Sequence, residues 1–525
     1  MNNIQILDCT LRDGGYCNNW EFGFNNIKKI IKGLLNANIE IIECGFISNK
    51  GFYNPNISRF NRLDEIKEVI PIDKKGKLFV AMMNYGEFDI NSLPVYDGSS
   101  IDGIRVAFHK RDCFDALDWC KKIKEKGYLV FIQPMVSLNY MDYEFINLLI
   151  EVNKINPYAF YIVDSFGMMK EKDLTRLFYL IENNLNSNIM VGFHCHNNMQ
   201  LAYSNAQRLT LLQTNRNIII DTSVYGMGRG AGNLNTELFI EYLNDNYEKK
   251  YFLSPILNII DEIIDDFYQQ NYWGYSLPNY ISAVYNAHPN YARYLDDKKT
   301  LTINDMNDIF TMIDEEKKVQ FDKDYIEELY IKFMESEKVQ DHHKTKINQI
   351  LKGKEVVLIA PGKSSVDEAN SIINFIKDNN VVVISINYAY DYIKPDYVFL
   401  SNLRRYRELN LGHNYKFIVT SNIPIKGAYL QINYRDLLNE EEMVRDNAGL
   451  MAIKFLIIQG VASIYLAGFD GYSHDTDENY GRTEMAFITR NEILDKINLG
   501  MEKVLKSFSE SARIHFLTEP KRFNI

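Results

Sequence analysis

The sequence predicts an α/β protein: an eight-stranded TIM-type (β/α)8 barrel with a helical subdomain, followed by a C-terminal doubly wound, Rossmann-like unit. Short apolar runs rich in β-branched residues alternate with amphipathic stretches from Ile4 to about residue 240, and this alternation restarts at Lys354. Runs that are apolar on both faces are typical of parallel strands covered by helices. Because 525 residues exceed one ordinary domain, we assign three parts. They are the barrel at 1–245, the helical subdomain and linker at 246–350, and the Rossmann-like unit at 351–525.

Eight strand-like runs precede residue 240. They cover residues 4–7, 39–44, 78–82, 103–108, 128–133, 159–163, 189–193 and 218–220. Eight runs with helical segments between them favour a closed barrel. An open doubly wound sheet is the alternative for the same alternation.

Ionisable and polar residues cluster where these runs end. They are Asp8 and Asp13, Glu43, Asn84, Gln133, Asp164 with Ser165, His194 with His196, and Asp221 with Asn233. In a barrel the carboxyl ends of all strands meet at one rim, and this rim carries the chemistry. We therefore expect an active-site face there and include Gln133 among the substrate contacts.

Helical patterns follow the barrel. Ser254-Pro255 is typical of a cap residue followed by proline at the first helical position, and isoleucines then repeat at helical spacing. Further patterns cover 302–314 and 322–334. The stretch 335–354 is charged, and we interpret its His342 and His343 as part of a solvated connecting helix because no carboxylate motif frames them.

Composition and charge exclude several classes of function. Lys and Arg total 58 against 69 Asp and Glu, a net charge of -11 that disfavours binding to nucleic acid or anionic membranes. The six cysteines form no Cys-x-x-Cys pair, so we expect neither a disulfide framework nor a structural zinc site. Residues 1–8 lack the basic and apolar pattern of a signal peptide, and no apolar run approaches the ~20 residues of a membrane span, so we expect neither secretion nor a membrane span. We expect a cytoplasmic protein that acts on small molecules.

A metal site is predicted after the seventh run. His194 and His196 lie two residues apart on a strand, hence on the same face. Two such rings with a carboxylate suit Mn²⁺, Fe²⁺, Zn²⁺ or Mg²⁺. Asp13 offers that carboxylate, and Arg12 beside it can stabilise negative charge on a substrate oxygen. Without this context, two hydrogen-bonded core histidines explain the pattern equally well.

Five motifs at strand ends resemble those of a known enzyme family. They are Asp8-Cys9-Thr10-Leu11-Arg12-Asp13-Gly14, Glu43-Cys44-Gly45, Asp164-Ser165-Phe166-Gly167, His194-Cys195-His196-Asn197 and the glycine-rich segment 226–233. In this order they look like the motifs of metal-dependent barrels that handle pyruvate or acyl-CoA. That family includes 4-hydroxy-2-oxovalerate aldolase and other 4-hydroxy-2-oxoacid aldolases, hydroxymethylglutaryl-CoA lyase and isopropylmalate synthase. The resemblance covers residues 1 to about 240.

The resemblance implies roles for individual residues. The implied metal ligands are Asp13, His194, His196 and Asn233. Mn²⁺ or Mg²⁺ is the expected ion, with Zn²⁺ and Co²⁺ as alternatives. Arg12 would stabilise an enolate, Ser165 would help hold a 2-keto acid, and Glu43 matches an acidic position near the substrate.

The general base departs from the family pattern. The aldolases resembled here carry a histidine at the position of Tyr16. The Tyr16 phenol, a water at the metal, or a group from the helical subdomain would have to replace it. His288 is our candidate from that subdomain, with Tyr275 or Tyr285 nearby, although a histidine at a helix end beside Pro289 also has a purely structural interpretation.

The glycine-rich segment 226–232 has two interpretations. Glycine permits a tight backbone turn around the metal, and it equally permits close contact with a phosphate or coenzyme A. Condensation of an acyl-CoA in a Claisen reaction is therefore the alternative to aldol chemistry at this site.

The C-terminal unit carries a second constellation. Its strand-like runs cover 355–360, 381–386, 397–401, 417–420 and 464–467, with a final run at 513–517. The run at 355–360 leads into a Gly/Ser loop and a helix start, a ready anion site. With Asn387 and the Gly468-Phe469-Asp470 turn, this unit resembles bacterial sialyltransferase-like and pterin-diphosphokinase-like domains, which implies binding of a nucleotide sugar or another phosphorylated donor. The candidate contacts are Gly362, Ser364, Ser365, Asn387, Asn402 and Asp470.

We therefore expect a bifunctional enzyme, acting in bacterial surface-polysaccharide synthesis and assembled as a homo-oligomer. A metal-dependent aldolase or lyase would make or break a carbon–carbon bond between a 2-keto acid and an aldehyde, and the C-terminal unit would bind a donor. A catalytic histidine of the sialyltransferase kind is not evident, since His474 lies too close to Asp470 and His515 lies within the last run. A non-catalytic binding or oligomerisation module is therefore the alternative for this unit.

Overall fold

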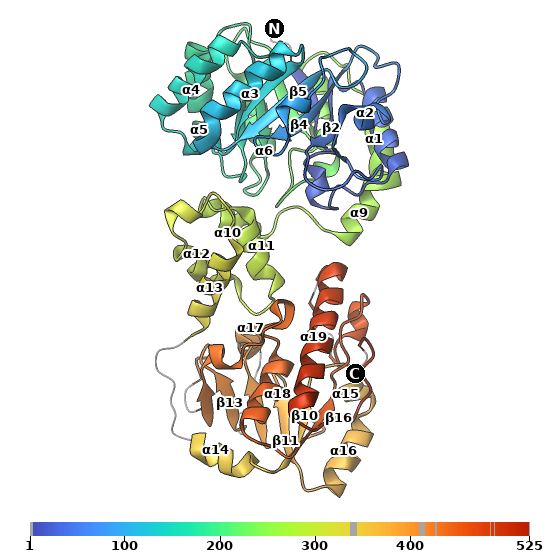
Figure 1. The fold of residues 1–525 in the computed structure, drawn as a ribbon, viewed down its shortest axis with the longest axis vertical. Coiled ribbons are helices and arrows are strands. Elements are labelled where there is room, and N and C mark those ends of the chain that lie inside the picture. Colours follow the sequence, from blue (N-terminus) through green and yellow to red (C-terminus); the bar gives the residue numbers. More distant parts are fainter. Residues whose placement is uncertain are drawn as a thin grey trace. The chain divides into compact units, whose positions relative to one another are not determined.

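The chain folds into two compact units (Figure 1). The computed structural model describes residues 4–335, 344–408, 415–425, 428–482, 485–487 and 489–523, so His342 and His343 lie outside the described residues. The first unit consists of Met1–Ala292 and Glu315–Phe321, and the second of Arg293–Asp314 and Asp322–Ile525. The two units thus share the helical stretch that follows the barrel.

The first unit contains a closed barrel of eight parallel strands. The strands are β1 (Ile4–Asp8), β2 (Ile41–Ile47), β4 (Leu78–Asn84), β5 (Gly103–Phe108), β6 (Leu129–Pro134), β7 (Ala159–Asp164), β8 (Met190–Cys195) and β9 (Ile218–Thr222). Each strand pairs in parallel with the next, and β1 closes the barrel by pairing with both β9 and β2. The predicted barrel and its eight runs are confirmed. The sequence analysis missed only β3 (Arg59–Phe60), a two-residue strand that extends the sheet beside β2.

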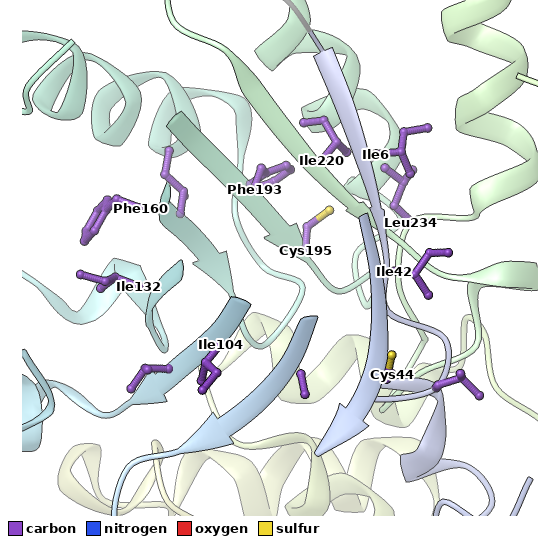
Figure 2. Close-up of a cluster of buried hydrophobic side chains, with 14 of the residues drawn as sticks. Ile6, Ile42, Cys44, Ile104, Ile132, Phe160, Phe193, Cys195, Ile220 and Leu234 are labelled. Carbon is purple, nitrogen blue, oxygen red and sulfur yellow. The ribbon is translucent and has the colours of Figure 1, made fainter. Parts of the chain in front are cut away.

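Helices follow most of the strands and pack against them. They are α1 (Phe24–Asn36), α2 (Leu63–Lys67), α3 (Cys113–Glu125), α4 (Asp142–Ile155), α5 (Glu171–Asn184), α6 (Ala202–Leu211) and α7 (Thr236–Asn246). In α1, isoleucine and leucine recur every three or four residues and are all buried, which gives the helix one apolar face. Figure 2 shows the strand residues of the same core, including Ile6, Phe160 and Phe193. These strand and helix side chains form one layer between the barrel and its helices.

A second, smaller cluster fills the barrel interior. Leu7, Val80, Phe131, Tyr161 and Ile219 all belong to it and are fully buried. Because successive residues of a strand point to opposite faces, Ile6 packs outward while its neighbour Leu7 packs inward. The interior is thus a packed core, and the rim at the carboxyl ends of the strands is the part of the barrel open to chemistry.

Several helices follow the barrel. They are α8 (Leu253–Ile259), which continues through a π-helical turn (Ile260–Ile264) into α9 (Asp265–Gln270), then α10 (Leu277–Val284), α11 (Pro289–Asp297), α12 (Ile303–Thr311) and α13 (Lys323–Met334). The predicted helices at 302–314 and 322–334 are confirmed. The predicted start at Ser254-Pro255 is wrong, because α8 begins at Leu253; Pro255 lies in its first turn, where the missing N–H loses no helical hydrogen bond. Within the described ranges, no helix has the length and apolarity to cross a membrane.

The second unit contains a parallel sheet of seven strands. They are β10 (Glu355–Ile359), β11 (Val382–Ile386), β12 (Tyr397–Leu400), β13 (Phe417–Thr420), β14 (Leu430–Ile432), β15 (Ser463–Ala467) and β16 (Ile514–Phe516). Their spatial order is β14-β13-β12-β11-β10-β15-β16. Strands β11 to β14 therefore lie on one side of β10, and β15 and β16 lie on the other. A second parallel sheet is thereby confirmed, and only the short β14 was missed. The Rossmann-like classification of this unit stays a prediction.

Helices also accompany the second sheet. They are α14 (Lys344–Leu351), α15 (Ser364–Asp367), α16 (Ala369–Asp378), α17 (Leu403–Glu408), α18 (Ala448–Ile458) and α19 (Asn491–Ser511). Helix α18 is almost entirely apolar and most of its residues are buried, as expected for a helix packed on a sheet. Its first residues reach the carboxyl-end side of the sheet, which matters for the site described below.

Gly192 makes room for an aromatic ring inside the barrel. It pairs with Tyr161 across β7 and β8, and a Cβ atom on Gly192 would lie 2.3 Å from the Tyr161 ring. We predict that Gly192→Ala lowers the free energy of unfolding by about 1–3 kcal/mol through overpacking, measured by urea unfolding. Gly33→Ala is the control, because its methyl group would come close only to the flexible end of Ile259 and would lie at an ordinary contact distance of 3.5 Å from Pro255 O. Equal losses in the two variants would contradict this account.

Candidate active site

Three predicted metal ligands converge at the barrel rim. Asp13 lies in the turn after β1, His194 in β8 and His196 directly after β8. One ligand atom of each lies within 4.8 Å of the others, and all three residues are buried. The geometry therefore allows the three side chains to share one divalent ion.

Asp13 is held by hydrogen bonds on both carboxylate oxygens. Its Oδ1 accepts from Arg12 Nη1 at 2.5 Å and its Oδ2 from Asn233 Nδ2 at 2.7 Å. Burial opposes ionisation, but the charge of Arg12 outweighs it and keeps the pKa of Asp13 well below its usual range. Burial also lowers the pKa of His196 to about 3. The carboxylate is thus ionised and the imidazole neutral, which are the forms that bind a metal.

His194 is oriented by a carboxylate of the next strand. Its Nδ1 lies 2.9 Å from Asp221 Oδ2, and this contact leaves Nε2 as the atom available to a metal. A carboxylate behind a metal-binding imidazole fixes its tautomer and ring orientation. The sequence analysis placed Asp221 at the rim but gave it no function.

A buried arginine connects the rim residues below the site. Arg105, in β5, donates to Glu43 Oε2 at 2.8 Å and also to Asp221. Glu43 Oε2 in turn accepts from Arg12 Nε at 2.9 Å. The amide oxygen of Gln133, in the orientation that satisfies both groups, accepts from Arg105 at 2.9 and 3.2 Å. In this structure Glu43 and Gln133 therefore bind protein cations, and both serve to position the residues above them.

Several buried polar atoms at the rim have no hydrogen-bond partner within the described part of the chain. They include Arg12 Nη2, Asn233 Oδ1 and His196 Nδ1. Asn233 already uses its amide nitrogen on Asp13, so its oxygen is left as a further metal ligand of the predicted kind. Arg12 uses Nε and Nη1 on carboxylates, so Nη2 is left for a substrate oxygen. These unused atoms fit a divalent ion with an oxyanion beside it.

Gly228 permits the close approach of the glycine-rich loop to this group. A Cβ atom at Gly228 would lie 2.3 Å from Asn233 Nδ2 and 2.8 Å from Asp13 Oδ2. Any side chain here would push Asp13 and Asn233 apart. This contact favours the interpretation of the segment as a tight turn around the ligands.

Ser165 and Tyr16 flank the predicted ligands. The Ser165 hydroxyl accepts from Val136 N at 3.0 Å, which leaves its own proton free to donate. The Tyr16 ring packs edge-on against Trp20 and Phe46, with centroid distances of 4.8 and 6.4 Å. Tyr16 lies in the loop after β1 and Ser165 in the loop after β7, and the functions of both residues remain predictions.

His288 reaches the rim from the segment that precedes α11. Its ring packs on Phe166, the residue after Ser165, at a centroid distance of 5.8 Å. Its Nδ1 accepts from Asn290 N at 3.2 Å, so the neutral ring carries its proton on Nε2. Burial, aided by the charge of Arg229, lowers its pKa to about 2. His288 is therefore arranged as a hydrogen-bond donor rather than as a base, and the alternative Tyr275 is exposed.

The sequence analysis missed two residues of this rim, His109 and Arg229. His109 directly follows β5, the one barrel strand to which no polar rim residue was assigned. Burial and the charges of Arg111 and Arg229 lower the pKa of His109. Arg229 lies within the glycine-rich motif, which the sequence analysis interpreted only through its glycines. The position of His109 after a predicted strand was a sufficient signal.

A separate cavity of about 410 Å³ lies in the second unit, at the carboxyl ends of its strands. Of the predicted contacts, Gly362, Asn387, Asn402 and Asp470 line it. Ser364 and Ser365 are fully buried beneath it. The Ser364 hydroxyl donates to Asp470, and the Ser365 hydroxyl donates to Gly362 O at 2.6 Å. Ser364 thus joins the loops after β10 and β15, and Ser365 closes the turn after β10.

Comparisons with known proteins relate the barrel to a family of lyases. Residues 111–259 match the family model described as HMGL-like. The 4-hydroxy-2-oxovalerate aldolase of Geobacillus thermodenitrificans is 25% identical over 279 residues, which cover 50% of this chain and 79% of the relative. The N-terminal domain of a candidate aldolase from Bacteroides vulgatus is 27% identical, with a TM-score of 0.48 over 57% of this chain and 98% of that one. The HMG-CoA lyase of Bacillus subtilis is 13% identical, with a TM-score of 0.41 over 51% and 93%.

Removal of the buried arginine tests the network under the site. Arg105→Met should lower the free energy of unfolding by about 3–5 kcal/mol, because Asp221 would remain buried without its arginine and Glu43 would keep only Arg12. Arg62→Met is the matched control, since the Arg62 side chain is 74% exposed, and it should change stability by less than about 0.5 kcal/mol. Urea unfolding of both variants measures the difference. A loss at Arg105 no larger than that at Arg62 would refute the network.

Proposed function

We propose that the barrel is a divalent-metal-dependent aldolase or lyase that makes or breaks a carbon–carbon bond of a 2-keto acid through a pyruvate-type enolate. The observation that carries this proposal is the convergence of Asp13, His194 and His196 beside the unused Nη2 of Arg12. The HMGL-like match and the relatives named 4-hydroxy-2-oxovalerate aldolase support it.

The residues at the rim fit a divalent ion. Asp13, His194, His196 and Asn233 Oδ1 would hold it, a mixed donor set that suits Mn²⁺ or Mg²⁺ and also admits Zn²⁺ or Co²⁺. Such an ion would act as a Lewis acid that polarises a carbonyl oxygen. Asp221 orients His194 and Arg12 orients Asp13, because each binds its ligand residue in this structure.

Arg12 and Ser165 would bind the keto acid. Arg12 Nη2 is aimed at no protein group among the described residues, while Glu43 and Asp13 fix the rest of the guanidinium. A preorganised donor of this kind stabilises charge that develops on an enolate oxygen. The free proton of the Ser165 hydroxyl can be donated to the substrate carboxylate.

Proton transfer to the 4-hydroxyl requires a base near Tyr16. His288 presents Nε2–H and would donate a hydrogen bond to a substrate oxygen. Tyr16 and His109 are two side chains at this rim that can accept the proton. The lowered pKa of His109 favours the neutral ring that a base needs at neutral pH.

The alternative within the same barrel is Claisen condensation of an acyl-CoA. Both reactions require an enolate at the same place. The metal ligands and Arg12 therefore do not distinguish the aldol reaction from the Claisen reaction. The close contact of Gly228 with Asp13 and Asn233 gives the glycine-rich loop a function without a phosphate. We therefore retain the aldol reaction as the proposal.

Exchange of methyl protons tests the enolate directly. The Mn²⁺-loaded protein should exchange the methyl protons of pyruvate in deuterated water, followed by proton NMR. A chelator and Asp13→Asn should each abolish exchange, because the enolate loses its stabilising charge. His474→Gln, at an exposed position 2.8 Å from Asp495, is the control and should leave exchange unchanged.

Other results of this experiment would redirect or end the proposal. Exchange on acetyl-CoA without exchange on pyruvate would favour the Claisen reaction. Failure to exchange protons of any 2-keto acid or acyl-CoA would overturn the enolate mechanism.

We also propose that the second unit binds a phosphorylated donor, such as a nucleotide sugar, in its cavity. The cavity lies where the strand order reverses beside β10, the usual ligand crevice of open α/β sheets. Asn387 accepts from Ser401 N through Oδ1, while its Nδ2 has no partner in the described ranges. Asn447 to Gly449, at the start of α18, also line the cavity and present a helix N-terminus to an anion.

The remaining cavity wall offers cations and aromatic faces. Arg405 and Lys496 supply positive charge, and Phe469, Tyr472 and Phe487 supply faces on which a base can stack. Together with an aldolase, a donor site of this kind suits the synthesis of a keto acid-derived sugar for bacterial surface polysaccharide. A binding or assembly module without transfer activity is the alternative.

Titration of the full chain with sugar nucleotides tests the cavity. UDP- and CMP-sugars should bind, as measured by calorimetry. Lys496→Met should weaken binding by about 3- to 10-fold, because one cation at the cavity rim is lost. Lys506→Met, on the same helix α19 but outside the cavity lining, should have no effect. Failure of every sugar nucleotide to bind would end this part of the proposal.

A further inference from the structure

Three arginines approach the barrel rim, and two of them are matched by carboxylates. Arg12 binds Asp13 and Glu43, and Arg105 binds Glu43 and Asp221. Arg229 forms no ion pair with any residue in the described ranges. It is therefore the one cation of this group whose charge the barrel does not balance.

Arg229 lies beside Tyr16 and the loop that carries Ser165. Its guanidinium carbon is 5.3 Å from the centroid of the Tyr16 ring, and its Nη2 makes a long contact of 3.4 Å with Ser165 O. Its charge lowers the pKa of His109 and of His288, in addition to the effect of burial on both rings. Arg229 thus lies between Tyr16 on one side and the Ser165 loop on the other.

The surrounding residues replace only part of the hydrogen bonding that the Arg229 guanidinium would have in water. Its Nε is buried and has no hydrogen-bond partner in the part of the chain that the structure describes. Removal of a charged donor from water without a partner is unfavourable, and one aromatic face with one long contact replaces little of that hydration. A carboxylate or phosphate oxygen would supply what is missing, because the fork of donors on arginine matches both groups.

The anion of the keto acid does not require Arg229. In the proposed function the Ser165 hydroxyl would meet that carboxylate, and Arg12 Nη2 would meet the enolate oxygen. Arg229 instead packs on Tyr16, which replaces the histidine expected to serve the 4-hydroxyl formed from the aldehyde. The surplus cation therefore lies on the side of the second substrate.

We propose that Arg229 binds an anionic group, a carboxylate or a phosphate, on the aldehyde that reacts with the enolate. This inference rests on the proposed aldolase function and names the chemical class of its second substrate. It predicts that the enzyme prefers acidic aldehydes over neutral aldehydes of similar length.

The experiment uses the full-length, Mn²⁺-loaded protein with pyruvate and three aldehydes. Propanal is neutral, succinic semialdehyde carries a carboxylate and glyceraldehyde 3-phosphate carries a phosphate. Arg229→Met should lower kcat/KM about 10- to 100-fold for whichever acidic aldehyde the wild type prefers, and change it less than about 3-fold for propanal. Arg229→Lys should retain part of the preference, and Arg176→Met, at a partly exposed position on α5, should retain all of it. The two acidic aldehydes distinguish a carboxylate from a phosphate site.

Methyl-proton exchange of pyruvate separates this inference from the proposed function. Exchange needs no aldehyde, so it should persist in Arg229→Met, which also shows that the variant is folded. A raised KM for pyruvate with unchanged aldehyde preference would assign Arg229 to the keto acid and overturn the inference. A wild-type preference for propanal would overturn it as well. Absence of exchange in the wild type would instead refute the proposed function, and the inference with it.

Discussion

The geometry of the barrel rim depends on one buried cation, Arg105. It is fully buried inside the barrel and binds Glu43 and Asp221, two carboxylates that would otherwise repel each other. Burial alone would lower the pKa of Arg105, but the two carboxylates raise it above its ordinary value, so the guanidinium remains charged. Glu43 then orients Arg12, and Asp221 orients His194. The Arg12 guanidinium and the His194 imidazole are thus both held in place by buried protein carboxylates.

Burial and neighbouring charges determine the protonation states of the titratable groups at the rim. Asp13 is ionised because Arg12 outweighs its desolvation, and His196 and His288 are neutral because they are buried near cations. A site with an ionised carboxylate and neutral rings is suited to a metal rather than to free imidazolium chemistry. Arg229 is the exception, since its charge has no carboxylate to balance it among the described residues.

The two units place their sites by the same physical constraint. In each, parallel strands present their carboxyl ends on one side of the sheet, and the loops that follow carry the polar residues. In the first unit these loops converge because the sheet closes. In the second unit the sheet is open, and the reversal of strand order beside β10 separates two loops and leaves the cavity between them. Asn387 adopts a left-handed backbone conformation there, with φ of 53°, as often occurs where a loop is constrained by a site.

The sequence by itself determined the strands of the barrel, because runs apolar on both faces are readable residue by residue. It also determined that Asp13, His194 and His196 lie at strand ends. The tertiary structure alone decided which side chains meet across the barrel. Arg105 sits within a run that looks apolar, and it joins residues of β2 and β9 only when the sheet closes. Likewise, Ser364 was predicted as a ligand contact, and only the fold shows that it pairs with Asp470, in the loop after β15 and 106 residues later. The alternation of residues along a strand predicts the face of the sheet on which a side chain lies. Which residue that side chain contacts depends on how distant segments of the chain pack together.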